Sequence, residues 1–283
     1  MIPAQNRKRE SRVAAVRVYN RLVRVCSWNI WSKGSLLSGS GSEPGPRRER
    51  HWKSVAAELA ELDLDLIGLQ EIDYRWGPRS DNADVASDIA EILGYEKLFS
   101  PSISLEDGSR AYGNAIFSRE PWSASGRVSL SPEISWDRAD HETEPRSAVW
   151  VQIEKLGLVF ITLHLANAIN LEASPILKLQ LTRVEKLVKE LAERFPGNQI
   201  ILSGDFNLAS DSAEIVKLGE LLPRQGAAEP TWSVHPFEYR GWQELPPPRF
   251  AIDHIFSSKT MNFSVGSSEL SDHLPIFAES IGR

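Results

Sequence analysis

The feature of this sequence that most constrains its fold is a short apolar segment flanked by a polar residue, and the pattern occurs six times. Apolar and β-branched runs of this length are typical of buried strands. The polar residues are Asn29 after 25–28, Glu71 after 66–70, His164 after 160–163, Asp205 and Asn207 after 200–204, Asp253 and His254 after 250–252, and Asp272 and His273 before 274–276. One such residue alone is equally consistent with a turn or a helix cap. Six of them predict strands that place these side chains along a common edge, because a buried carboxylate is costly without a partner.

The rest of the chain predicts an α/β fold in which a few helices interrupt many strands. The expected strands are 22–28, 64–69, 115–118, 147–153, 158–163, 200–202, 250–256 and 274–280. Helical spacing of apolar residues predicts helices at 48–62, 84–93, 176–195 and 212–221. Gly157 predicts a hairpin, and the Ser-, Gly- and Pro-rich segment 32–46 predicts a long exposed loop. We find no regular βαβ repeat and no linker that divides the chain.

Length and composition restrict the class of protein. A chain of 283 residues with 41% hydrophobic and 25% charged residues has the balance of a globular protein. Cys26 is its only cysteine, which excludes an intrachain disulfide framework and a metal site built from cysteine alone. No apolar run approaches the ~20 residues of a membrane span, and no secretory signal is evident. We therefore expect a cytoplasmic protein with a basic N-terminal extension at 1–22 and a single domain at 23–283.

Formal charge is divided unevenly along the chain. Residues 1–24 contain seven basic residues and one acidic residue, which gives +6, so the remaining residues carry −12 of the total of −6. An acidic body argues against broad nonspecific DNA binding, which depends on Lys and Arg contacts to phosphates. It suits a protein that gathers carboxylates around a cation. The basic segment is consistent with contact to nucleic acid or to an anionic surface, but a solvated terminus explains it more simply.

The residue types in the repeated pattern indicate a hard metal ion. Carboxylate and amide oxygens favour Mg²⁺ or Mn²⁺ over Zn²⁺. Glu71, Asn29 and Asp272 are the expected oxygen ligands. His164 and His273 are then left to contact the charge that develops on a substrate.

Seven motifs occur in order along the chain: 27–30 (Ser-Trp-Asn-Ile), 69–72 (Leu-Gln-Glu-Ile), 112–119 (Tyr-Gly-Asn-Ala-Ile-Phe-Ser-Arg), 162–165 (Thr-Leu-His-Leu), 204–207 (Gly-Asp-Phe-Asn), 252–255 (Ile-Asp-His-Ile) and 271–275 (Ser-Asp-His-Leu-Pro). Together they resemble the motif set of the endonuclease/exonuclease/phosphatase superfamily, which includes DNase I-like nucleases, inositol polyphosphate 5-phosphatases and neutral sphingomyelinases. The resemblance runs from about Val23 to Pro275. It implies a DNase I-like α/β fold: a four-layered α/β sandwich of two mixed β-sheets packed face to face, with helices outside and a metal site at one edge.

The same resemblance implies a role for each residue of the pattern. The implied roles are principal Mg²⁺ ligand for Glu71, neighbours of the cation for Asn29 and Asp272, orientation or deprotonation of the attacking water for Asp205, phosphate binding for Asn207, imidazoles facing the phosphate for His164 and His273, and orientation of the last histidine for Asp253. Phosphoryl transfer requires the same kinds of residue, because it depends on positioning the reactants and on stabilising the negative charge that spreads over the phosphate oxygens.

Three further residues are candidates for substrate binding, each with an alternative. Asn114 resembles a phosphate-contacting asparagine, or it forms a turn in its Tyr-Gly-Asn segment. Arg146 pairs either with a phosphate or with a surface acid. Trp232 stacks on a base or sugar, or lies in the core as most tryptophans do. We expect solvated or structural roles for the remaining histidines, His51, His141, His235 and His254.

The chain departs from the superfamily's pattern at two places. Many relatives have an acidic residue two positions after the histidine of the fourth motif, where this chain has Ala166 followed by Asn167. The sequence therefore does not define the hydrogen-bond partner of His164. Some nucleases have an aspartate where this chain has Trp31, which weakens the inference of a second metal ion.

The expected function is hydrolysis of a phosphomonoester or phosphodiester by in-line attack of a water activated by Mg²⁺, or Mn²⁺ in its place, and by Asp205. The substrate class is not readable, because the superfamily reuses one metal site for nucleic acids, inositol phosphates and phospholipids. A structure-specific nuclease or DNA-end-processing phosphodiesterase is the alternative. A non-catalytic binding protein that keeps the fold is a third reading. The sequence defines no oligomeric state.

Overall fold

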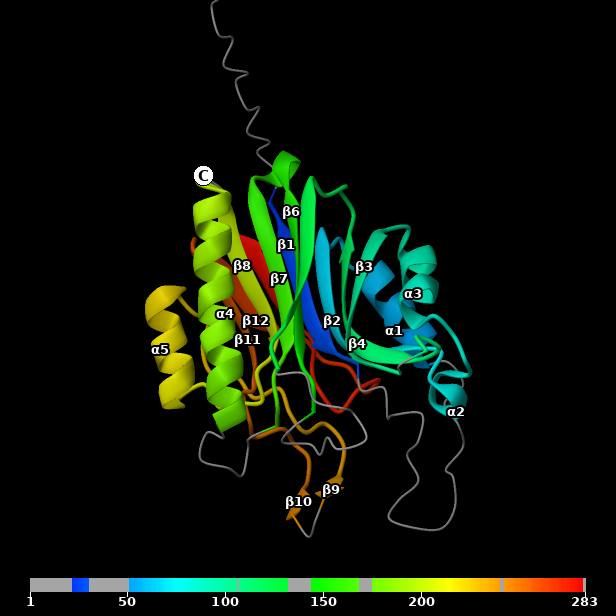
Figure 1. Cartoon of the computed structure of the whole chain (residues 1–283). Helices are drawn as coiled ribbons and strands as arrows, with labels where there is room; N and C mark the ends of the chain where they lie inside the picture. The colour runs from blue at the N-terminus through cyan, green and yellow to red at the C-terminus, as the bar shows by residue number, and fades with distance from the viewer. Residues whose placement is uncertain are drawn as a thin grey trace, which may run out of the picture.

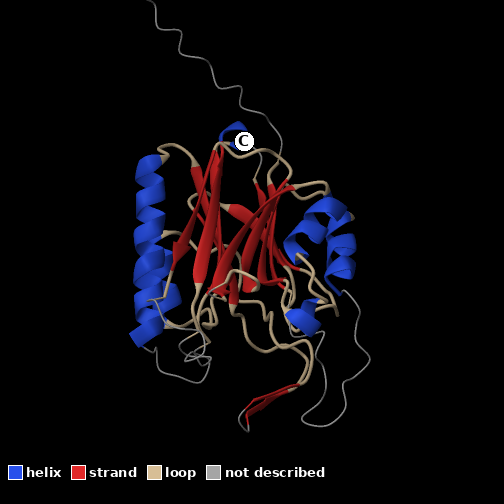
Figure 2. Cartoon of the chain, turned by 45° about the vertical axis from the view of Figure 1, so that its right-hand side comes forward, coloured by secondary structure: helices blue, strands red, loops and turns tan. Residues whose placement is uncertain are grey.

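Two β-sheets lie face to face, and helices cover their outer surfaces (Figures 1 and 2). The computed structural model describes residues 22–30, 51–105, 107–131, 144–167, 175–239 and 242–281. Residues 1–21 of the expected basic segment, Trp31, the expected loop 32–46 and His141 lie outside these ranges. The order of layers, helix, sheet, sheet and helix, confirms the predicted four-layered α/β sandwich.

The first sheet has six strands in the order β12, β13, β1, β2, β4, β3. Their bounds are Met261–Val265, Ile276–Ser280, Arg24–Asn29, Leu66–Tyr74, Ala111–Ser118 and Glu96–Ser104, in that order. β1 runs parallel to β2, whereas the other neighbours are antiparallel, so the sheet is mixed. The pairing of β1 with β13 brings residues far apart in the sequence to the same part of the sheet.

The second sheet has five strands in the order β11, β8, β7, β6, β5. Their bounds are Asp253–Ser257, Gln199–Asp205, Leu158–His164, Ser147–Ile153 and Ala124–Ser129, in that order. β7 is parallel to β8, and the register pairs His164 with Asp205. β11 is antiparallel to β8 and pairs Asp253 with the same Asp205. Three predicted site residues therefore stand side by side on adjacent strands.

Helices pack on the outer face of each sheet. Their bounds are His51–Ala60 (α1), Gly77–Ser80 (α2), Val85–Leu93 (α3), Pro175–Arg194 (α4) and Ala213–Leu221 (α5). One apolar cluster joins α1 and α3 to the first sheet through side chains such as Trp52 and Phe117, and a second joins α4 and α5 to the second sheet. A third cluster, with Val25, Phe160 and Ile201, fills the space between the sheets. Burial of these faces is the main force that holds the layers together.

The sequence predicted the strands with strong apolar runs and missed the weaker ones. β3 contains Pro101 and is mostly half-exposed, and β5 alternates between exposed and half-buried positions, so neither has a clear apolar pattern. β12 and the hairpin formed by β9 (Phe237–Tyr239) and β10 (Trp242–Glu244) were also missed. The predicted hairpin at Gly157 is confirmed, with a short 3-10 turn, Glu154–Leu156, joining β6 to β7.

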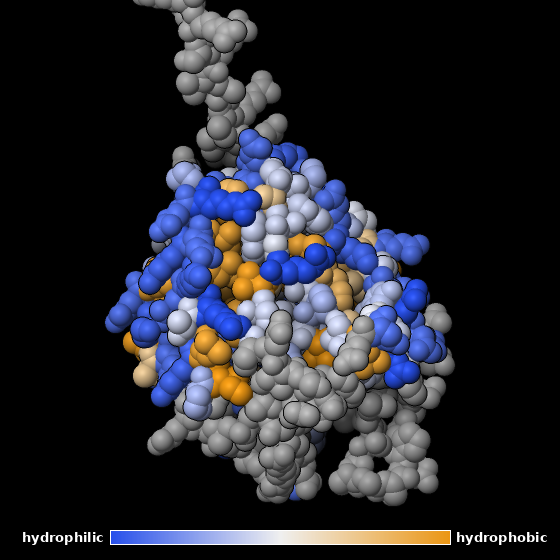
Figure 3. Space-filling view, in the orientation of Figure 1, coloured by the Kyte–Doolittle hydropathy of each residue, from blue (hydrophilic) through white to orange (hydrophobic). Residues whose placement is uncertain are grey.

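Apolar side chains at the surface do not form a continuous face in the view of Figure 3, where they appear as separate patches between polar ones. Among the most exposed are Val216, Leu245 and Ile281, which come from different parts of the chain. Within the described residues, no helix has both the length and the apolar character needed to cross a membrane.

His254 of β11 has a structural position, as the sequence analysis expected. Its ring is buried against Phe206, with 5.5 Å between ring centroids, and its Nε2–H donates to the carbonyl of Leu208 at 2.9 Å. Burial lowers the pKa of His254 to about 4, against the opposing effect of that hydrogen bond and of Asp253. The folded protein therefore keeps this ring neutral where an unfolded chain, with a pKa of 6.5, takes up a proton.

We predict that His254 makes the fold sensitive to acid. As pH falls from about 7.5 to about 5, only the unfolded state protonates this ring, so the free energy of unfolding should fall by about 2 kcal/mol relative to a His254→Gln variant. Denaturant unfolding of both proteins at the two pH values measures this difference. The comparison cancels the other groups that titrate in this range. Parallel pH profiles would contradict a neutral His254 in the folded state.

Candidate active site

The polar residues predicted from the sequence meet at the edge where β1, β7 and β8 end, the lower edge in Figure 1. We call this group the edge cluster; its members are Asn29, Glu71, His164, Asp205, Asn207, Asp253, Asp272 and His273. All are buried except Glu71, which is half-buried. The sequence-based prediction of a common edge is therefore confirmed.

Asn29 connects the two sheets at this edge. It is the last residue of β1 in the first sheet, and its Nδ2 donates to Oδ2 of Asp205, the last residue of β8 in the second sheet, at 3.0 Å. The same amide lies 3.3 Å from Oε1 of Glu71. The backbone carbonyl of Asn29 accepts a 2.6 Å hydrogen bond from Ser271, which fixes the segment that carries Asp272. One residue, through its side chain and its backbone carbonyl, thus sets the relative positions of several members of the edge cluster.

Glu71 occupies a break in the pairing of β2 with β4. The register shifts between Leu69 and Ile72, and Glu71 has a φ of 62°, a conformation that few residues other than glycine adopt. Such a bulge redirects a side chain out of the regular alternation of a strand. The preceding Gln70 is buried, and its Nε2 donates to Oγ1 of Thr162 in the second sheet at 2.8 Å, which anchors the bulge.

Asp205 is the most enclosed carboxylate of the edge cluster. Its Oδ2 lies 3.3 Å from Nε2 of His164 and 3.7 Å from Nε2 of His273, and its Oδ1 accepts from the backbone N–H of Asn207 at 2.9 Å. Burial raises the pKa of Asp205 to about 7, with Asp253 adding to the rise, although His273 and the hydrogen bonds oppose it. A carboxyl group with this pKa exchanges a proton near neutral pH.

The ring of His273 is paired with the carboxylate of Asp253. Its Nδ1 lies 2.9 Å from Oδ2 of Asp253, and that oxygen also accepts a 2.6 Å hydrogen bond from Oγ1 of Thr231. Burial alone would lower the pKa of His273, but Asp253, Asp205 and Asp272 together raise it to about 10. This imidazole is therefore cationic at neutral pH. Thr231 was not identified from the sequence, because a threonine in an irregular segment carries no recognisable pattern.

Asp272 is held by Trp232. The indole Nε1–H donates to Oδ2 of Asp272 at 3.0 Å, and the ring of Trp232 is 4% exposed. Burial raises the pKa of Asp272, and the nearby charge of Glu71 raises it further. The alternative that Trp232 lies in the interior is confirmed, whereas stacking on a substrate stays a prediction.

His164 lies between Asp205 and a buried arginine. Nη1 of Arg146 is 3.0 Å from Nδ1 of His164, and Nη2 of the same guanidinium donates to Glu144 at 3.0 Å. Position 166, where relatives have an acid, contributes its backbone N–H to Oε1 of Gln180 instead. Arg146 thus pairs with an acid as one alternative predicted, and its contact with a phosphate stays a prediction.

Asn114 is not in a turn. It lies within β4, is 1% exposed and donates from Nδ2 to the carbonyl of Ser147 in β6 at 2.8 Å, which ties the first sheet to the second. The turn alternative is therefore wrong, because the Tyr-Gly-Asn segment continues as strand. Its predicted contact with a phosphate is not tested by this geometry.

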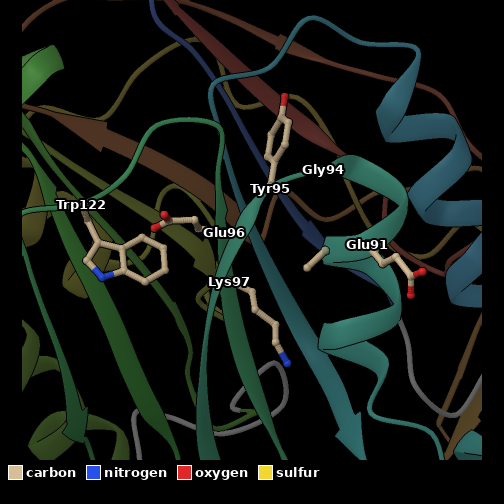
Figure 4. A pocket seen from close by; sticks show the side chains of 7 residues that line it. Glu91, Gly94, Tyr95, Glu96, Lys97 and Trp122 are labelled. Carbon is tan, nitrogen blue, oxygen red and sulfur yellow. The ribbon is translucent and has the colours of Figure 1, made fainter.

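A shallow depression elsewhere is separate from the edge cluster. It is lined by Ala90, Glu91, Gly94, Tyr95, Glu96, Lys97 and Trp122, beside α3 and β3 (Figure 4). Lys97 is already bound to Asp84 at 3.2 Å and to Ser87. The labelled side chains point in different directions and do not converge. This depression therefore has no set of groups arranged for chemistry.

Two mixed sheets packed face to face, with polar residues gathered at one edge, define the DNase I-like sandwich as the class of this protein. The family model for the endonuclease/exonuclease/phosphatase family matches residues 26–273, and the chain therefore belongs to this family. No curated protein sequence gave a significant match.

Solved structures agree with this assignment of the fold. A family member from Bacteroides thetaiotaomicron shares 21% identity, with a TM-score of 0.61, and the match covers 92% of this chain and 94% of that one. The mannosyl-6-phosphatase of Bacteroides thetaiotaomicron VPI-5482 shares 22% identity, with a TM-score of 0.61 and coverage of 92% and 100%. The catalytic domain of human Nocturnin, solved with a bound sulfate, shares 18% identity, with a TM-score of 0.57 and coverage of 91% and 93%.

We predict that Gly204, next to Asp205, tolerates no side chain. It has a φ of 147°, and an added Cβ would lie 2.0 Å from the carbonyl oxygen of Leu163. Gly204→Ala should therefore lower the free energy of unfolding by at least about 2 kcal/mol through strain and steric conflict. Gly219→Ala in α5 is the matched control, since its Cβ would meet no heavy atom within 4 Å. The control should raise the free energy of unfolding by about 0.5–1 kcal/mol. Urea unfolding measures both, and equal stabilities would contradict the prediction.

Proposed function

We propose that this protein is a divalent-metal-dependent phosphoesterase that hydrolyses a phosphomonoester or phosphodiester by in-line attack of water. The observation that carries the proposal is the position of Asp205. This carboxylate, with a pKa of about 7, lies between the oxygen donors around Asn29 and the cationic ring of His273. Membership of a family of phosphate-ester hydrolases supports the reaction class.

The donor set of Glu71, Asp272 and Asn29 fits Mg²⁺, with Mn²⁺ as the alternative. Glu71 and Asp272 have carboxylate oxygens and Asn29 has an amide oxygen, and oxygen atoms of both kinds are ligands that Mg²⁺ prefers. Glu71 raises the pKa of the buried Asp272, so the two negative charges repel each other, and a cation relieves this repulsion. Mg²⁺ held by these residues would supply a positive charge that polarises a phosphate oxygen.

A second set of groups is close enough to hold a metal. Ligand atoms of Asp205, Asp253 and His273 all lie within 4.8 Å of one another. However, Nδ1 of His273 is already bonded to Asp253 at 2.9 Å. A cationic imidazole is also a poor metal ligand, because both ring nitrogens carry protons. We therefore assign this set to proton handling.

In the proposed mechanism Asp205 accepts a proton from the attacking water. Its raised pKa makes it a stronger base than an ordinary aspartate at neutral pH. The amide of Asn29 and the backbone N–H of Asn207 fix the two carboxylate oxygens, so that the lone pair of one oxygen keeps its direction. The Nδ2 of Asn207 donates to the carbonyl of Leu165 at 3.0 Å, and we propose the same amide as the donor to a phosphate oxygen.

His273 stabilises negative charge on the phosphate in this proposal. Asp253 fixes its ring through Nδ1, which leaves the Nε2–H on the side of Asp205. A cationic donor at that position stabilises charge that spreads over the phosphate oxygens during transfer.

A small phosphate ester is the substrate class that the charge distribution favours. Residues outside the first 24 carry a formal charge of −12, which disfavours a long polyanion. The basic residues of the first 24 favour the second candidate, a phosphodiesterase that processes nucleic-acid ends. The mannosyl-6-phosphatase neighbour motivates phosphorylated sugars as the first compounds to test. We propose that residues 23–283 form one catalytic domain.

A panel of substrates tests the proposed function. It contains phosphorylated sugars, inositol phosphates, a phospholipid and 5′- or 3′-phosphorylated oligonucleotides, each with Mg²⁺ and each repeated with Asp205→Asn. Hydrolysis of one class by the wild type, and its loss in the variant, supports the proposal. Equal turnover by both proteins, or none across the panel, contradicts it.

We predict that Glu71→Gln raises the Mg²⁺ concentration needed for half-maximal activity by at least about tenfold, because a neutral amide replaces a ligand carboxylate. Excess EDTA should abolish wild-type activity. Glu96→Gln on β3, which lines the separate depression, is the matched control and should leave the Mg²⁺ requirement unchanged. Full activity in EDTA would exclude the metal.

We predict that Asp253 and His273 act as one unit. Asp253→Asn and His273→Gln should each lower kcat/KM by about 10²–10⁴, and the double variant should be little worse than the worse single variant. Because the carboxylate raises the pKa of His273, Asp253→Asn should also move the alkaline limb of the pH profile to lower pH. The measurement is kcat/KM against pH for the three variants. Additive losses with an unshifted limb would show that Asp253 has only a structural role.

A further inference from the structure

The two ring nitrogens of His164 face groups of opposite character. Nδ1 lies 3.0 Å from Nη1 of Arg146, and Nε2 lies 3.3 Å from Oδ2 of Asp205. Both His164 and Arg146 are 4% exposed, so bulk solvent screens their contact little. Among the described residues, the charged groups shown against the ring are Arg146, from the segment before β6, and Asp205, at the end of β8, and Arg146 is in turn paired with Glu144.

The contact with Arg146 determines where the imidazole proton lies. A guanidinium group has only N–H donors and no acceptor, and it does not lose its proton in proteins. Although burial opposes it, the neighbouring acids Glu144, Glu71 and Asp205 hold the pKa of Arg146 above its ordinary value. Nδ1 of His164 must therefore accept a hydrogen bond, which requires that it carry no proton.

The other nitrogen must then carry the proton, since a ring with two bare nitrogens would be an anion. The side of the ring that faces Asp205 supports this assignment, because Oδ2 of Asp205 lies 3.3 Å from Nε2 of His164 and can accept the Nε2–H. Nδ2 of Asn207 also lies 3.0 Å from Nε2, and one of its two N–H groups donates to the carbonyl of Leu165 at 3.0 Å. The second N–H of Asn207 would bond to Nε2 only in the other tautomer, which would place a ring N–H against the donor-only guanidinium of Arg146.

We infer that Arg146 is a positioning residue that fixes His164 as the neutral tautomer with its proton on Nε2, so that His164 donates a hydrogen bond to Asp205 and does not act as a proton-donating acid. The catalytic meaning of this inference rests on the proposed phosphoesterase function, whereas the tautomer itself does not. The guanidinium of Arg146 lies beside Nδ1 of His164, at the position where an acidic partner would accept a hydrogen bond from the ring. An acid there would favour the imidazolium, and a guanidinium disfavours it.

The inference separates the two histidines of the edge cluster. His273 has Asp253 at Nδ1 and is a cation, while His164 has Arg146 at Nδ1 and is neutral. Of the two histidines, His273 alone then adds positive charge near the phosphate. His164 instead keeps the oxygen of Asp205 in position, and its uncharged ring does not lower the basicity of that carboxylate as a cation would.

Nitrogen-15 NMR of the full chain tests the tautomer without any substrate. The protein has six histidines, and the signals lost in His164→Gln identify the ring of interest. In the wild type we expect a pyridine-type Nδ1 and a pyrrole-type Nε2 for His164, unchanged from about pH 5.5 to about pH 8.5. A pyrrole-type Nδ1, or an imidazolium spectrum near neutral pH, would overturn the inference, and this result needs no variant of Arg146.

Arg146→Met then tests the role of the guanidinium. Without it, His164 should show a mixture of tautomers and should protonate as the pH falls, and kcat should drop at least about tenfold with little change in KM. Arg119→Met, at the far end of β4 and bound to Asp63 and Tyr95, is the matched control and should leave the His164 signals unchanged. A raised KM with unaltered His164 signals would instead make Arg146 a phosphate ligand and overturn the inference. Loss of activity in every protein alongside the expected wild-type spectrum would reject only the proposed function.

Discussion

The hydrogen bond from Asn29 to Asp205 joins the edges of two sheets whose facing surfaces pack mainly through apolar contact. Apolar packing fixes how far apart the sheets lie, but it has little directional preference and does not by itself set how one sheet is placed along the other. Directed hydrogen bonds add that information. Besides Asn29, Gln70 donates to Thr162 at 2.8 Å and Asn114 donates to the carbonyl of Ser147 at 2.8 Å, each from the first sheet to the second. The residues that form the candidate site therefore also set the alignment of the sandwich.

The pKa of each buried titratable group in the site depends on how enclosed the group is and on which charged residues are its neighbours. Asp205 has a raised pKa because it is enclosed, and Asp272 because it is enclosed beside Glu71. The cationic His273 offsets part of the cost of burying these carboxylates. Each charge is partly balanced by a neighbour from another strand, so the electrostatics of the site depend on the sheet packing described above.

Much of this arrangement could be predicted from the sequence. Apolar runs that end in a polar residue located the strands and their meeting point, because a strand with strong alternation or full burial leaves a clear pattern. β3 and β5, which lie at sheet edges with many exposed positions, left none. The bulge at Glu71 and the contact between Arg146 and His164 could not be predicted either. Both depend on backbone geometry and on side chains brought together across the fold, and no local spacing records them.

The position of β13 has a consequence for how the chain acquires its structure during synthesis. This strand enters the first sheet between β12 and β1, and the indole of Trp28 donates to the backbone of His273 across 245 positions of sequence. Until residues beyond Ile276 emerge from the ribosome, β1 keeps one edge without its final partner, and such an edge can pair with other chains. The nascent protein therefore carries an unpaired edge on β1 while the residues between β1 and β13 are synthesised. Chaperone binding to the early segment is the protection that such a topology calls for.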